Sequence, residues 1–315
     1  MSREKLKILA AVDGSEQSLR AVSYLSEFLS PTRTEVTIFH VVKTMPQTFR
    51  DLEQSRGFPG RDRLVGAWEE KQDAFIRDFM DRAVEALVTA GFSRDNIRVK
   101  VTGLAEGVAR DILREAAAGL YDAAVVGGSG LGKIKDLLLG TVADKLLGNL
   151  HHIPLCIVSG RPDPTGMLLA LDASECSKRA ASFAVSLAEN KARETRLLHV
   201  VKTLGFPREI PEAKELVEAA QQALEEEARA VMAPLFDEIK RRLVKAGPAE
   251  KSIVSKVETG APSRAWAIIE EARSTGTGTI ILGRRGLSKF EEYLLGRVGA
   301  KVARLAKNQA VWVVN

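Results

Sequence analysis

The chain has 315 residues, of which 45% are hydrophobic and 28% charged, and its formal net charge at pH 7 is +5. This length predicts two domains, and the composition is that of an ordinary soluble globular protein, which excludes a fibrous or disordered chain. No apolar run approaches the roughly 20 residues of a membrane span, and the N-terminal segment does not resemble a secretory signal, so we expect a cytoplasmic protein without a membrane partner. Basic clusters interleaved with aromatic residues are missing, so nucleic acid is not an expected partner.

Strands and helices alternate along the first half of the chain. Strands are predicted over residues 6–13, which form a short apolar run, and over 35–44, 96–103, 121–127 and 153–160. Apolar residues spaced three and four apart predict helices after Ser15, over 64–90, over 106–119 and after Thr141. This order predicts a doubly wound α/β domain, in which a parallel sheet carries helices on both faces. Its ligand crevice should lie beyond the C-terminal ends of the first and fourth strands, where the strand order reverses.

The same order restarts after a proline-containing linker at residues 161–166. The segment MLLALDASE repeats ILAAVDGSE, so that Asp172 answers Asp13, and the pentapeptide HVVKT occurs at 40–44 and again at 199–203. We therefore expect two tandem domains, residues 1–160 and 166–315, each with a five-stranded parallel sheet.

Each half also contains a glycine loop between its fourth strand and its last helix. The first loop has Gly127, Gly130 and Gly140 followed by Thr141, and the second has Gly283, Gly286 and Gly296 at the same spacing. Glycines let backbone N–H groups face a ligand, and a helix N-terminus adds further donors, so such a loop suits a phosphate. The alternative is that both loops only make tight turns and that Asp13 only caps a turn.

With these residues in view, the sequence resembles the universal stress protein family in its tandem form, over essentially the whole chain. The family's ATP-binding pattern, G-x2-G-x9-G-[S/T], is complete in the first half. The resemblance implies a Rossmann-like fold of the adenine nucleotide alpha-hydrolase type and bound ATP, with any Mg²⁺ held mainly by phosphates. It places Asp13 and Val41 beside the adenine and ribose and Gly127 under the ribose. The phosphates would be held by Gly130, Gly140, Thr141 and Val142.

The second half departs from this pattern. Asp172, Val200, Gly283, Gly286 and Gly296 are in place, but Arg297 stands where the pattern has Ser or Thr. Arg284 and Arg285 replace the small residues Gly128 and Ser129. Either these cationic side chains bind phosphates more strongly than a hydroxyl would, or they fill the groove, and the sequence leaves both alternatives open.

The expected function is that of an ATP-binding regulatory or protective stress protein rather than a fast enzyme. No catalytic residue and no protein metal site is predicted, and any ATP hydrolysis should be slow. Two alternatives stay open: a slow ATPase or nucleotidyl-transferring enzyme, and a protein-interaction scaffold that binds no nucleotide. The resemblance also implies an internal pseudo-dimer through the fifth strands, residues 155–158 and 311–314, and leaves a homodimer of chains open.

Overall fold

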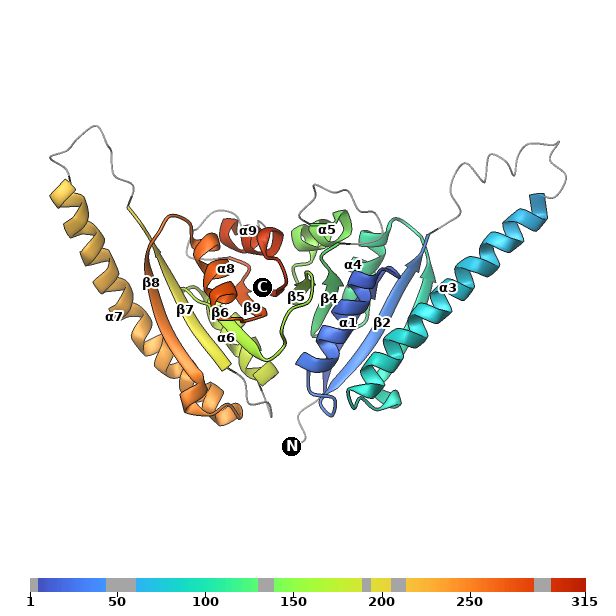
Figure 1. Cartoon of the computed structure of the whole chain (residues 1–315), viewed down its shortest axis with the longest axis horizontal. Helices are drawn as coiled ribbons and strands as arrows, with labels where there is room; N and C mark the ends of the chain where they lie inside the picture. Colours follow the sequence, from blue (N-terminus) through green and yellow to red (C-terminus); the bar gives the residue numbers. More distant parts are fainter. Residues whose placement is uncertain (1–4, 44–60, 130–138, 189–193, 205–213, 286–295) are drawn as a thin grey trace.

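The computed structural model describes residues 5–43, 61–129, 139–188, 194–204, 214–285 and 296–315. These residues form one ten-stranded sheet with the strand order β3-β2-β1-β4-β5-β10-β9-β6-β7-β8. All neighbouring strands run parallel except β5 and β10, which pair antiparallel at the middle of the sheet. The sheet therefore consists of two parallel five-stranded halves joined edge to edge (Figure 1).

Both halves have the predicted alternation of strands and helices. The first domain comprises β1 (Leu6–Val12), α1 (Glu16–Phe28), β2 (Thr34–Val42), α3 (Arg61–Thr89), β3 (Ile97–Gly103), α4 (Val108–Ala118), β4 (Ala123–Gly127), α5 (Thr141–Asn149) and β5 (Leu155–Val158). The second comprises β6 (Gly166–Ala170), α6 (Glu175–Ala188), β7 (Glu194–Lys202), α7 (Lys214–Ala246), β8 (Ile253–Ala261), α8 (Arg264–Ser274), β9 (Thr279–Gly283), α9 (Arg297–Leu305) and β10 (Ala310–Val314). The prediction of two tandem, doubly wound α/β domains is thus confirmed.

Helices bury both faces of the inner strands of the sheet, whereas the edge strand β3 is largely exposed. Successive side chains of β1 alternate between two cores: Ile8 packs with residues of α1 and α3, and Leu9 packs with residues of α4 and α5. The second domain repeats this with α6 and α7 on one face and α8 and α9 on the other. Burial on both faces explains why the inner strands are continuous apolar runs in the sequence. The long helices α3 and α7 lie at the two outer ends of the molecule (Figure 1).

The two domains meet at the predicted pair of fifth strands. In the antiparallel β5–β10 pair, Trp312 lies opposite Cys156, and both side chains are fully buried. The Trp312 ring packs against Phe28 of the first domain and Phe183 of the second, with centroid distances of 6.4 Å and 5.3 Å. The expected internal pseudo-dimer is therefore present, and its centre is an aromatic core. Among the helices of the described residues, none combines the length and the apolar character that a membrane crossing requires.

Candidate functional site

Asp13, Val41 and Gly127 of the first domain, which the sequence predicted to bind a ligand, meet at one edge of the sheet. Strand β1 has β2 on one side and β4 on the other, so the strand order reverses between β1 and β4. The register pairs Val12 with His40 and Ala11 with Val126, which places Asp13 level with Val41 and close to Gly127. The C-terminal edge of β1 and β4 is therefore the place where the strand order predicts a ligand crevice.

The last helix of the first domain begins at this edge. Gly140 is the N-cap of α5, and its N–H donates to the Gly128 carbonyl at 2.7 Å, which joins the two ends of the glycine loop. The first intrahelical bond is from the Asp144 N–H to the Gly140 carbonyl, so the N–H groups of Thr141 and Val142 precede the helical ladder. Within the described part of the chain, no side chain caps this helix end. Gly130 lies outside the described residues.

Close packing accounts for the glycine at the end of the fourth strand in both domains. A Cβ atom on Gly127 would lie 3.3 Å from the Ser18 nitrogen, at the start of α1. A Cβ atom on Gly283 would lie 2.9 Å from the carbonyl carbon of Cys176, at the start of α6. A Cβ atom on Gly283 would force the start of α6 to move, and one on Gly127 would need the start of α1 to shift by a few tenths of an ångström. Both glycines therefore let the end of the fourth strand approach a helix, with or without a ligand.

The first-strand aspartates hold the turns that follow them. Asp13 Oδ1 accepts a hydrogen bond from the Ser15 N–H at 3.0 Å, and Ser15 in turn caps α1. Asp172 Oδ1 accepts the Ser174 N–H at 3.1 Å in the second domain. One carboxylate oxygen of each aspartate therefore fixes an Asx turn, which orients the carboxylate at the edge of the crevice.

In each domain a histidine of the second strand lies within hydrogen-bond distance of the end of the first strand. His40 Nδ1 lies 2.9 Å from the Val12 carbonyl oxygen, and His199 Nδ1 lies 2.8 Å from that of Leu171. These bonds join the end of the second strand to the end of the first in each domain. They give both histidines a structural contact.

The loop before α4 is held by a carboxylate that sequence reasoning missed. Asp111 accepts hydrogen bonds from the N–H groups of Ala105 at 3.0 Å, Glu106 at 3.2 Å and Gly107 at 3.4 Å. These donors, Ala105 foremost, hold the pKa of the Asp111 carboxyl below its usual value of 3.8. The loop leads directly into Val108, which packs against the core that α4 and α5 form on one face of the sheet.

We expect the Asp111→Asn variant to lose part of the pH dependence of stability. Because the folded-state pKa is lowered, the carboxylate stabilises the fold above about pH 4, and this contribution disappears as the pH falls through the folded-state pKa. Urea unfolding at pH 7 and at pH 3 measures the effect: the wild type should lose more stability between the two than the variant. An equal loss in both proteins would contradict the prediction.

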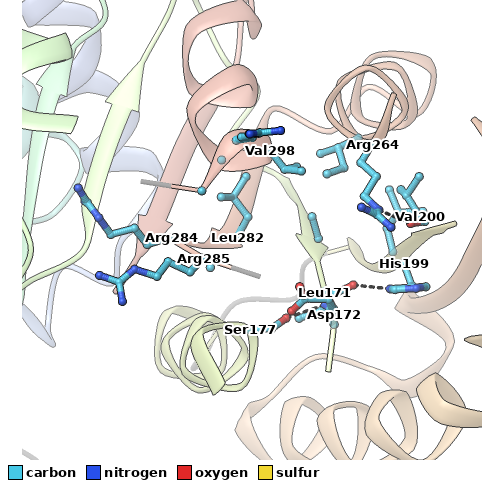
Figure 2. Close-up of a pocket in the computed structure, with 17 residues that line it drawn as sticks. Leu171, Asp172, Ser177, His199, Val200, Arg264, Leu282, Arg284, Arg285 and Val298 are labelled. Carbon is cyan, nitrogen blue, oxygen red and sulfur yellow. Dashed lines mark hydrogen bonds between the residues drawn. The ribbon is translucent and has the colours of Figure 1, made fainter. Parts of the chain in front are cut away.

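A pocket of about 580 Å³ lies at the equivalent edge of the second domain (Figure 2). It brings together all the second-half positions that the sequence named within the described residues, namely Asp172, Val200, Gly283, Arg284, Arg285, Gly296 and Arg297. Gly296 is the N-cap of α9, and its N–H donates to the Arg284 carbonyl at 2.9 Å, as Gly140 does in the first domain. Gly286 lies outside the described residues.

The sequence left open whether the Arg284 side chain binds phosphates or fills the groove. In the structure it does neither. Its side chain is 3% exposed and reaches the C-terminal end of α5 in the first domain. The guanidinium donates to the carbonyls of Leu147 at 2.8 Å, Gly148 at 3.2 Å and Leu150 at 2.9 Å. Burial lowers the pKa of Arg284 to about 10. In Figure 2, Arg284 and Arg285 both extend away from Asp172 and Arg264.

Arg264 is a pocket residue that sequence reasoning missed. It is the first residue of α8, and its Nε donates to the Val200 carbonyl at 3.2 Å (Figure 2). The corresponding first residue of α4 is Val108. The two repeats differ at this position in the sequence, with a valine in the first and an arginine in the second. Only the fold shows that the arginine side chain reaches the end of β7.

Comparisons with known proteins agree with the fold. The family model described as the universal stress protein family matches residues 6–158 and again residues 166–315. Universal stress protein YxiE of Bacillus subtilis (strain 168) is 27% identical over 145 residues, which cover 44% of this chain and 92% of that protein.

Several solved structures are similar over nearly the full length. A universal stress protein from Archaeoglobus fulgidus DSM 4304 is 18% identical, with a TM-score of 0.59 and coverage of 99% of this chain and 97% of that one. A functionally unknown protein from Pseudomonas aeruginosa PAO1 is 13% identical, with a TM-score of 0.55 and coverage of 98% and 92%. At these identities the likeness shows the fold alone. Because the family model accounts for nearly the whole chain in two consecutive matches, the chain belongs to the universal stress protein family, with two family domains in tandem.

Proposed function

We propose that this stress protein binds ATP in the crevice of the first domain. The observation that carries the proposal is the convergence of Asp13, Gly127 and the start of α5 at the edge between β1 and β4, where a doubly wound sheet binds its ligands. The helix start supplies backbone N–H groups and the positive end of a dipole, which suit phosphates. The complete glycine pattern of this half supports the same ligand.

Each residue of the crevice has a role that its chemistry allows. The Asp13 carboxylate accepts hydrogen bonds from the ribose hydroxyls, and the Val41 backbone pairs with the adenine edge. The N–H groups of Thr141 and Val142 hold phosphate oxygens, with the Thr141 hydroxyl as a further donor. Mg²⁺ would arrive bound mainly to the phosphates, which is its usual state with nucleotides. Binding would bias the conformation or the partner choice of the protein.

A charge substitution at the first residue of α5 or α9 can weaken phosphate binding in one domain at a time. Thr141 and Arg297 occupy equivalent positions at the starts of α5 and α9, and both are exposed. Glutamate at either position repels phosphates, while an acidic residue in the first turn favours the helix itself. Gly296→Ala is unsuitable for this purpose, because its Cβ would lie 2.8 Å from the Arg284 carbonyl oxygen.

The test is calorimetric titration of ATP with Mg²⁺ into nucleotide-free protein. The Arg297→Glu variant should bind ATP in the first crevice, and adding Thr141→Glu should weaken this binding by about tenfold or more, or at least 1.4 kcal/mol. Thr141→Ser is the matched control, since it keeps the hydroxyl and should bind as tightly as the parent. If Thr141→Glu binds ATP as well as Thr141→Ser does in the Arg297→Glu background, the first crevice is not the site.

A further inference from the structure

The candidate site of the first domain and the pocket of the second domain differ in charge at matching positions. The first helical residue after the third strand is Val108 in the first domain and Arg264 in the second. The first residue of the last helix is Thr141 in the first domain and Arg297 in the second. Both arginines line the second-domain pocket, where Asp172 is the acidic residue among the lining side chains. The second-domain pocket therefore favours an anionic ligand more strongly than the candidate site of the first domain does.

Arg264 also changes the hydrogen-bonding character of the end of β7. Its Nε donates to the Val200 carbonyl, which is the backbone position that corresponds to Val41 in the first domain. A guanidinium has five N–H donors and no acceptor. The exocyclic amine of adenine is also a donor, so an adenine whose amine faced Arg264 would set donor against donor. A carbonyl oxygen at the same ring position would instead accept a hydrogen bond from the arginine.

We propose that the second-domain pocket binds a phosphorylated nucleotide whose base presents a carbonyl oxygen, rather than an amine, to Arg264. The triphosphate end lies at Arg297 and the start of α9, and the base lies at the end of β7. This proposal rests on the proposed function, because it assumes that the two domains place a nucleotide in the same orientation. The two domains of one chain then select different bases.

Inosine triphosphate and ATP are the matched probes, because inosine has a carbonyl where adenosine has its amine. The Thr141→Glu variant silences the first crevice and reports on the second pocket. It should bind inosine triphosphate about tenfold more tightly than ATP, and adding Arg264→Val should abolish this preference. In the Arg297→Glu background, which reports on the first crevice, Val108→Arg should reduce the preference for ATP. Thermal unfolding of each variant confirms that it is folded.

Three results would overturn the proposal: equal affinity of Thr141→Glu for both nucleotides, a preference that survives Arg264→Val, or binding of inorganic tripolyphosphate as tight as that of inosine triphosphate. Failure of the proposed function is a separate result. It would appear as absence of ATP binding by the single variant Arg297→Glu, in which the first crevice is unchanged. Folded Thr141→Glu protein that binds neither nucleotide would also overturn the further proposal while leaving the first-domain site intact.

Discussion

Replacing Arg284 by methionine is expected to lower the free energy of unfolding by about 2–4 kcal/mol. The guanidinium is buried and donates to the carbonyls of Leu147, Gly148 and Leu150. These carbonyls belong to the C-terminal end of α5, where carbonyls have no partner within the helix. Methionine restores much of the volume but has no donor, so the variant leaves buried acceptors unpaired and removes a cation from the negative end of the helix dipole.

Urea unfolding at pH 7 measures this loss, and Arg304→Ala is the matched control. Arg304 also spans the two domains, through a 2.8 Å ion pair with Asp144, but both side chains are close to half exposed. Such a pair contributes about 1 kcal/mol or less. If the methionine variant and the Arg304→Ala variant lose the same small amount, the buried contacts of Arg284 do not hold the domains together.

The Arg284 contact also connects the two candidate sites. Arg284 directly follows β9, and its backbone carbonyl accepts a hydrogen bond from the Gly296 N–H at the start of α9. Its side chain donates to the C-terminal end of α5, the helix that begins at Thr141. The equivalent position in the first domain is Gly128, which has no side chain to make the reciprocal contact. The two halves are thus joined asymmetrically, although their folds are the same.

Truncation of Trp312 to alanine should cost about 3–5 kcal/mol, the range for removing a large buried aromatic side chain. The ring is fully buried between Phe28 and Phe183, and its Nε1 donates to the Tyr24 hydroxyl at 3.2 Å. That hydroxyl lies 3.0 Å from the Thr279 hydroxyl, so the contact joins the first helix of one domain to two strands of the other. The loss therefore falls on the interface between the domains.

Tyr24→Phe separates the polar part of this contact from the packing. It keeps the ring that stacks on Phe28 at 5.1 Å and removes only the hydroxyl, so we expect a loss of about 1–2 kcal/mol. Urea unfolding of both single variants and of the double variant gives the coupling energy between the two residues. A Trp312→Ala loss below about 1 kcal/mol would contradict a structural role for the aromatic core.

Much of this architecture could be predicted from local patterns. The apolar runs and the three-and-four spacing indicated the strands and helices, and the repeated segments indicated two domains of one fold. The crevice between β1 and β4 followed from the strand order that such a sheet adopts. The β5–β10 pairing followed from the family resemblance, because the two apolar edge strands alone do not say which partner covers them.

The side-chain contacts across the domains depended on the tertiary structure. Nothing in the RR pair at 284–285 indicates that the first arginine turns away from its own loop to cap a helix more than 130 residues earlier. The bond from Arg264 to Val200 likewise joins residues 64 positions apart. The periodicity of apolar residues and the spacing of motifs indicate how a segment folds against its own neighbours in the chain. The direction that a long cationic side chain takes is decided instead by which carbonyls the packed domains bring within its reach.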